Sequence, residues 1–172
     1  MSADDDRLDA NPFDTLALGV ARRLGVLPAA DSPIDRLPGV GRGAPAYWGK
    51  VLVISSAEPG EGKSFIVGRL AHRLAVAGAA QVAVADANAA HPSLHRCFKV
   101  PVAGAGLFDC IAEGRVIDAQ WVRSTVNRVE VMPTRVGARA SMLMRVAAVN
   151  RVFDGFRARF AITIVDAGVL AR

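Results

Sequence analysis

The length of the chain, 172 residues, suits one domain with a hydrophobic core and leaves little room for a second. Hydrophobic residues make up 52% of the sequence and charged residues 22%, which excludes disorder of the whole chain. The net charge of +5 comes almost wholly from arginine, without a basic stripe interleaved with aromatic residues, so we do not expect a nucleic acid partner. The N-terminus is acidic and no apolar run approaches the roughly 20 residues of a membrane span, so we expect a cytoplasmic protein.

Residues 1–50 differ in composition from the rest and are predicted to form an N-terminal arm. Asn11 as a cap and Pro12 at the first helical position, followed by spaced apolar residues, predict a short helix over 11–27 that packs on a neighbour. The stretch 31–49 is rich in proline and glycine, which break helices and strands, so it is predicted to be a linker. We therefore place the folded domain at residues 51–172.

From residue 51 onward, short strands alternate with helices. Four runs are β-branched and apolar on both faces, as buried parallel strands are: 51–55, 81–86, 128–133 and 161–166. Between them, apolar residues recur with helical spacing at about 63–77, 106–114 and 140–158. This pattern predicts an α/β domain with a mostly parallel sheet and helices on both faces.

The stretch AEPGEGKS, residues 57–64, has the spacing of the phosphate-binding loop GxxxxGK[ST], with alanine in place of the first glycine. Gly60 and Gly62 would let the backbone curl so that its N–H groups point at a phosphate. Lys63 would reach the β- and γ-phosphates, Ser64 would ligate Mg²⁺, and a helix beginning at Lys63 adds its positive dipole end. A surface turn with the same residues is the alternative, but such a turn rarely falls between a buried strand and a helix.

Residues 51–172 are therefore predicted to be a P-loop nucleotide-binding domain, with ATP or ADP and Mg²⁺ as cofactors. The residues predicted to bind the nucleotide are Glu58, Pro59, Gly60, Glu61, Gly62, Lys63, Ser64 and Phe65.

Two aspartates, Asp86 and Asp166, end predicted strands at the carboxyl edge of the sheet, where α/β proteins bind ligands. A carboxylate at such a position can hold a Mg²⁺-bound water, and it can also cap the following helix or turn. Because both aspartates accompany a phosphate loop, the metal role is favoured. We predict Ser64, Asp86 and Asp166 as metal ligands and Lys63, Asp86 and Asp166 as catalytic residues.

Five segments together resemble, in order and spacing, the bacterial tyrosine-kinase domains of capsule and exopolysaccharide synthesis, which are related to the Min and Par partitioning ATPases. The segments are VLVISSAEPGEGKS, VAVADAN, HPSLHRCF, GLFDCIAEG and FAITIVDAG, and the resemblance covers about residues 48–170. It implies a P-loop NTPase fold that binds ATP or ADP with Mg²⁺. Lys63 and Ser64 fall on the family's phosphate and Mg²⁺ positions, Asp86 on its first acid after the second strand, and Asp166 on its Walker B acid.

The sequence departs from this family at several positions. Asn88 stands where the family has a second acid and Ala90 where it has an arginine, and the lost negative charge is expected to weaken catalysis more than binding. The only tyrosine, Tyr47, lies in the arm, so the tyrosine-rich tail that the family phosphorylates is absent. The sequence stops at Arg172, where the family continues with further strands and helices, so we expect a sheet that is incomplete at its C-terminal end.

The resemblance implies a degenerate or truncated relative of these kinases. It would be an ATP-binding and Mg²⁺-binding component of exopolysaccharide or capsule biosynthesis or export, weak or inactive as a kinase and peripheral at the inner membrane. The implied partner is the cytoplasmic end of an inner-membrane polysaccharide co-polymerase, with self-association second.

Two other classes of function remain open. One is a partitioning-type ATPase, against which Glu58 occupies the stretch where those ATPases usually carry an early lysine. The other is a structural subunit that keeps the loop as a relic.

Overall fold

The structure, a computed structural model, describes residues 12–24, 49–77, 81–102, 106–114, 122–123, 129–134 and 146–169. The helices of these segments are α1 (Pro12–Leu24), α2 (Lys63–Val76), α3 (Leu94–Cys97), α4 (Leu107–Glu113) and α5 (Val146–Arg159). The strands are β1 (Lys50–Ser56), β2 (Val82–Asp86), β3 (Val122–Arg123), β4 (Glu130–Met132) and β5 (Ile162–Val169). From β1 onward, the four predicted strands β1, β2, β4 and β5 are separated by helices, as predicted.

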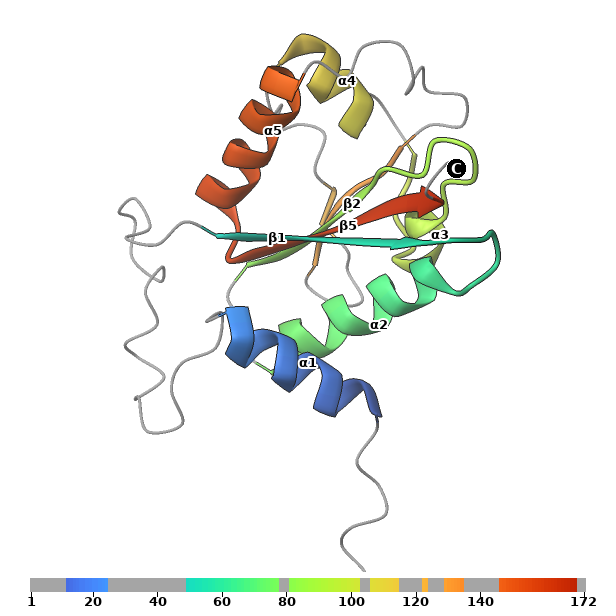
Figure 1. Ribbon diagram of the computed structural model, residues 1–172, viewed down its shortest axis with the longest axis vertical. Coiled ribbons are helices and arrows are strands. Elements are labelled where there is room, and N and C mark those ends of the chain that lie inside the picture. The colour runs from blue at the N-terminus through green and yellow to red at the C-terminus, as the bar shows by residue number, and fades with distance from the viewer. Residues whose placement is uncertain are drawn as a thin grey trace, which may run out of the picture.

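The strands form one sheet in the order β1-β5-β2-β4-β3 (Figure 1). β1, β5, β2 and β4 are parallel, and the two-residue β3 pairs antiparallel with β4. The predicted mostly parallel sheet is confirmed, while β3 was not predicted because two residues carry no periodic pattern. β5 continues to Val169, beyond its predicted end at Asp166, because Val169 pairs with Ser56 after an irregularity in the β1–β5 register.

Helices cover both faces of the sheet: α1 and α2 lie on one side, α4 and α5 on the other (Figure 1). Successive residues of a strand face opposite sides. On β5, Ile162 and Ile164 join the core under α2, whereas Val165 joins the core under α5 with Phe156. The predicted arrangement of helices on both faces is confirmed.

The predicted helix of the arm is present as α1 and packs against α2. Its buried contact is Ala17, 2% exposed, with Val20 and Leu24 partly buried against the same core. The remaining predicted parts of the arm, Asn11, residues 25–27 and most of the linker, lie outside the described residues, as does the start of the helix predicted over 140–158. The arm's boundary at residue 50 stays a prediction.

In the part of the chain that the structure describes, no helix combines the length and the apolar character needed to cross a membrane.

Candidate functional site

The turn between β1 and α2 has the backbone that a phosphate loop requires. β1 ends at Ser56 and α2 begins at Lys63, so residues 57–62 connect a strand directly to a helix. Gly60 and Gly62 have φ angles of 81° and 79°, in the left-handed region that strains residues with a Cβ. Both glycines are therefore needed for the curled backbone of the loop. Gly62 is the N-cap of α2, so the backbone N–H groups at the start of α2 lie next to the loop.

Lys63 folds back over this loop. Its side chain is 8% exposed, and its Nζ donates to Ser56 Oγ at 2.5 Å and to the carbonyl oxygen of Glu58 at 3.4 Å. Ser56 Oγ donates in turn to the same carbonyl at 2.7 Å. Both of these oxygens are neutral, so neither cancels the attraction of the ammonium group for an anion at the loop.

Ser64 and Asp166 meet although 102 positions separate them in the chain. Ser64 Oγ donates to one carboxylate oxygen of Asp166, and the other oxygen accepts the Gly168 N–H at 3.3 Å. Asp166 is fully buried. Its carboxylate and the Ser64 hydroxyl together provide two oxygen ligands beside the loop. Mg²⁺ takes such oxygen ligands, usually one or two from protein carboxylates with the rest from phosphates and water.

These residues fit Mg²⁺ even though the described part of the chain holds no group of three or more His, Cys, Asp or Glu side chains placed around one point. Such a group is not required, because Mg²⁺ bound with a nucleotide relies on phosphate oxygens for much of its coordination.

Asp86 lies beside Asp166 in the sheet and is fully buried. Its carboxylate accepts three backbone N–H groups, from Asn88 at 3.0 Å, Ser93 at 2.9 Å and Leu94 at 3.1 Å. These contacts tie the segment after β2 and the start of α3 to the end of β2, which is the capping role considered from the sequence. Burial raises the pKa of Asp86 to about 6, although the three backbone N–H groups act in the opposite direction. Its role as a metal ligand stays a prediction.

Two residues of this region were missed by the sequence reasoning. Ser56 holds Lys63, as described, and Thr134 Oγ1 donates to the backbone carbonyl of Asp86 at 2.6 Å. Thr134 is 1% exposed and follows β4, so it fastens the end of β4 to the end of β2. The sequence did offer a signal for Thr134, because a polar residue follows an apolar predicted strand. Its partner Asp86 becomes evident only from the pairing of β4 with β2.

Asn88 occupies the edge of the site. Its Oδ1 accepts the His91 N–H at 3.1 Å, and it packs so closely on Gly168 that a Cβ there would lie 3.2 Å from Oδ1. Gly168 also has a φ of 70°, in the left-handed region. Glycine is therefore required at this position both because a side chain would crowd Asn88 and because other residues would be strained. The amide of Asn88 is therefore held near Asp166 without adding a negative charge.

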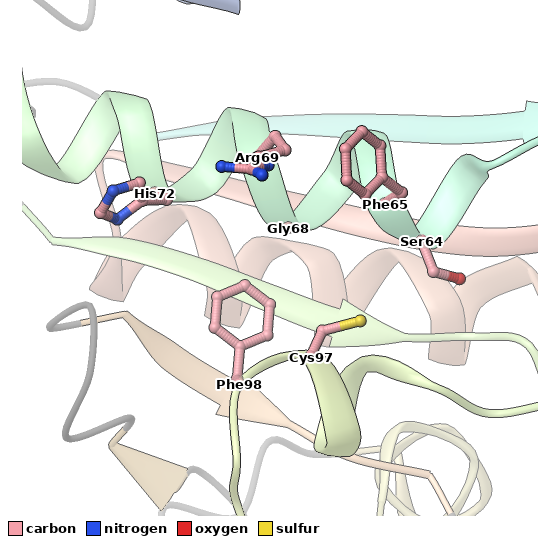
Figure 2. A pocket seen from close by; sticks show the side chains of 7 residues that line it. All are labelled: Ser64, Phe65, Gly68, Arg69, His72, Cys97 and Phe98. Carbon is pink, nitrogen blue, oxygen red and sulfur yellow. The ribbon is translucent and has the colours of Figure 1, made fainter.

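A pocket of about 360 Å³ opens beside Ser64, between α2 and the end of α3 (Figure 2). Phe65 is 54% exposed at this pocket, and the guanidinium of Arg69 lies 5.3 Å from the centre of its ring. Of the predicted nucleotide-binding residues, only Ser64 and Phe65 line it; the other lining residues are Gly68, Arg69, His72, Cys97 and Phe98. Phe65 thus lies in the first turn of α2, directly after Ser64, with its side chain at the pocket.

No protein-family model and no curated protein matches this sequence. Among solved structures, the chain is similar to the chimeric protein CapA2B2 (TM-score 0.66, 20% identity), covering 97% of this chain and 66% of that one. It is similar to the septum site-determining protein MinD from Pyrococcus horikoshii, complexed with Mg-ADP (TM-score 0.61, 16% identity), covering 72% and 50%. It is also similar to the kinase domain of the Escherichia coli tyrosine kinase Etk (TM-score 0.61, 22% identity), covering 69% and 46%.

The fold is that of the MinD-type P-loop NTPases. Bacterial tyrosine-kinase domains are among the structures that share it. The chain spans between 46% and 66% of the length of the three structures named above. The predicted fold class is confirmed.

Asp86 predicts a pH dependence of stability. The unfolded chain releases this proton near pH 3.8 and the folded protein only at about pH 6, so the folded state binds more protons between these values. The free energy of unfolding should therefore fall by about 3 kcal/mol as the pH rises from about 4 to about 6. Asp86→Asn, which cannot titrate, should lack this fall in urea unfolding without Mg²⁺, whereas Asp154→Asn at an exposed position should keep it. Equal pH profiles for all three proteins would contradict the assignment.

Proposed function

We propose that the protein binds ATP or ADP with Mg²⁺ at residues 57–64 and serves exopolysaccharide or capsule biosynthesis or export. The observation that carries the nucleotide site is the hydrogen bond of Ser64 with Asp166 at the start of α2, where the neighbouring residue Lys63 is buried against the loop. A hydroxyl, a carboxylate and an ammonium at the start of a helix match the chemistry of a metal-complexed polyphosphate. The Mg-ADP complex of the similar MinD structure supports this proposal.

Different groups of the chain would bind the phosphates and the Mg²⁺ ion. Lys63 would exchange its contacts with Ser56 and Glu58 for the β- and γ-phosphates, and the N–H groups at the start of α2 would donate to the same phosphates. Ser64 and Asp166 would hold Mg²⁺, with the neighbouring Asp86 as the third predicted ligand, and the bound ion would neutralise charge on the phosphates. Asp86 keeps the segment from Asn88 to Leu94 in place, so it supports the site even where it does not touch the metal.

We propose further that catalysis of phosphoryl transfer is weak. Asn88 provides only a neutral amide oxygen, which already accepts the His91 N–H. A second carboxylate would help to polarise an attacking hydroxyl or water, and the site lacks that charge. The protein then acts mainly as a nucleotide-bound component, comparable to a pseudokinase.

The proposed partner is the cytoplasmic end of an inner-membrane polysaccharide co-polymerase, with self-association as the second mode, and the protein is peripheral at the inner membrane. Similarity to the kinase domains of Etk and VpsO supports this proposal. α1 offers exposed apolar side chains for contact, since Leu16 and Leu18, on either side of the buried Ala17, are 44% and 41% exposed.

A second candidate function is a positioning ATPase of the MinD kind. The similarity to MinD favours it, at the same TM-score of 0.61 as that to Etk. Glu58 disfavours it, because the early loop lysine expected of such ATPases has no counterpart here. Nucleotide-dependent dimerisation without a membrane partner would favour this candidate.

Lys63→Ala should abolish most nucleotide binding. The variant removes a charge-assisted contact worth about 1.5–3 kcal/mol, which corresponds to roughly a tenfold to hundredfold weaker Kd for ATP or ADP with Mg²⁺. Lys50→Ala at the exposed start of β1 is the matched control and should bind like wild type. Titration calorimetry decides the matter: no binding by wild type at millimolar nucleotide, or equal binding by Lys63→Ala, would make the loop a relic.

Asn88→Asp should raise ATP turnover if a missing negative charge limits the reaction. The carboxylate can still accept the His91 N–H, so the local structure should persist. We expect slow hydrolysis by wild type, faster hydrolysis by the variant, and no phosphotyrosine on purified wild type after incubation with labelled ATP and Mg²⁺. Strong labelling of Tyr47, or a variant no faster than wild type, would show that catalysis is limited differently.

Contact through α1 is tested by affinity capture from a membrane fraction. Wild type should recover the co-polymerase, and a chain lacking residues 1–27 should recover less. Because that deletion also uncovers α2, the exposed-site variant Leu16→Asp should be tested beside it and should weaken capture without changing the unfolding midpoint. A well-folded monomeric wild type that captures no such protein would refute the proposed partner.

A further inference from the structure

The phosphate loop is held by its own side chains. The backbone N–H of Glu58 donates to Glu61 Oε2 at 3.1 Å, while the carbonyl oxygen of Glu58 accepts from Ser56 Oγ and from Lys63 Nζ. Both the backbone N–H and the backbone carbonyl of Glu58 are therefore hydrogen-bonded to side chains of residues 56–63. Two of these groups, a backbone N–H and the lysine ammonium, are of the kind that phosphates use at such loops.

The Glu61 carboxylate lies close to the groups around Lys63. The Glu58 N–H and, next, the Ser56 hydroxyl lower the pKa of the Glu61 carboxyl, and the charge of Lys63 adds to this effect. Glu61 Oε2 accepts the Glu58 N–H, and the carbonyl oxygen of Glu58 accepts from Ser56 Oγ and Lys63 Nζ, so the carboxylate, the hydroxyl and the ammonium all contact Glu58. Glu61 is exposed, so its carboxylate can leave this region without disturbing the core.

We propose that the Glu61 carboxylate is an internal anion that competes with the nucleotide phosphates for the loop. The inference rests on the proposed nucleotide site and adds a residue that opposes binding there. A phosphate that approaches the loop meets this negative charge on the Glu58 N–H and must displace the carboxylate to reach that N–H group. The affinity of the loop for nucleotide is therefore lower than its backbone and Lys63 alone would allow.

Glu58 provides a matched control for this inference. It lies three positions earlier in the same exposed loop and carries the same charge, but its contacts here are made by its backbone. If negative charge near the loop acted only through its general field, neutralising Glu58 or Glu61 would have the same effect. Competition by a docked carboxylate requires a larger effect from Glu61.

The experiment is calorimetric titration of wild type, Glu61→Gln and Glu58→Gln with ADP and Mg²⁺. Glutamine keeps an oxygen for the Glu58 N–H and removes only the charge. Glu61→Gln should bind about three- to tenfold more tightly than wild type, as expected for removing a nearby like charge. The gain from Glu58→Gln should be less than half as large, and the difference should shrink at about 1 M salt because salt screens exposed charges.

The outcomes separate this inference from the proposed function. Binding by wild type that depends on Lys63, with equal effects of Glu61→Gln and Glu58→Gln, would overturn the inference and leave the nucleotide site standing. Binding by Glu61→Gln but not by wild type would support the inference and refute nucleotide binding by the natural protein. Absence of binding by all three proteins would overturn both.

Discussion

The parallel pairing of β5 with β1 on one side and with β2 on the other is the constraint on which the site depends. Because the three strands run in one direction, the loop after β1 and the aspartates of β5 and β2 come to the same edge. The register then sets Asp86 beside Asp166 and brings Ser64 within hydrogen-bond reach of Asp166. A shift of the β5 register by one residue would turn the Asp166 side chain toward the opposite face of the sheet and separate it from Ser64.

Bringing two buried carboxylates to one edge is costly unless their oxygens find donors. Asp86 finds three backbone N–H groups, and Asp166 finds the Ser64 hydroxyl and the Gly168 N–H. Several local features serve this end, including the left-handed Gly168 and the attachment of Thr134 to the backbone of Asp86.

The polar groups of the loop are also hydrogen-bonded to one another. The Glu58 N–H donates to Glu61, and both Ser56 and Lys63 donate to the Glu58 carbonyl oxygen. Lys63 donates to Ser56 as well. The N–H and carbonyl groups of Glu58, the Ser56 hydroxyl and the Lys63 ammonium are thus hydrogen-bonded within the protein. Binding of a nucleotide therefore exchanges existing hydrogen bonds for new ones, and its net affinity depends on the difference between the two sets.

Much of this architecture could be predicted from the sequence. Apolar β-branched runs fixed the existence of β1, β2, β4 and β5, and the spacing of Gly60, Gly62, Lys63 and Ser64 located the loop between strand and helix. The extension of β5 to Val169 could not be predicted, because it depends on pairing with Ser56. The partners of Asp86 were also out of reach, since three N–H groups beyond β2 converge only once α3 has formed. Glu61 could be read as part of the loop, but its inward contact depends on the folded turn.

The most direct measurement is a crystal structure of the protein grown with ADP and Mg²⁺. We expect the β-phosphate to contact Lys63 Nζ and the N–H groups at the start of α2. We also expect Mg²⁺ on Ser64 and in contact with Asp166, directly or through water, and Glu61 turned away from the Glu58 N–H. Nucleotide bound elsewhere, or a loop that keeps its internal hydrogen bonds beside bound ADP, would contradict the proposed site.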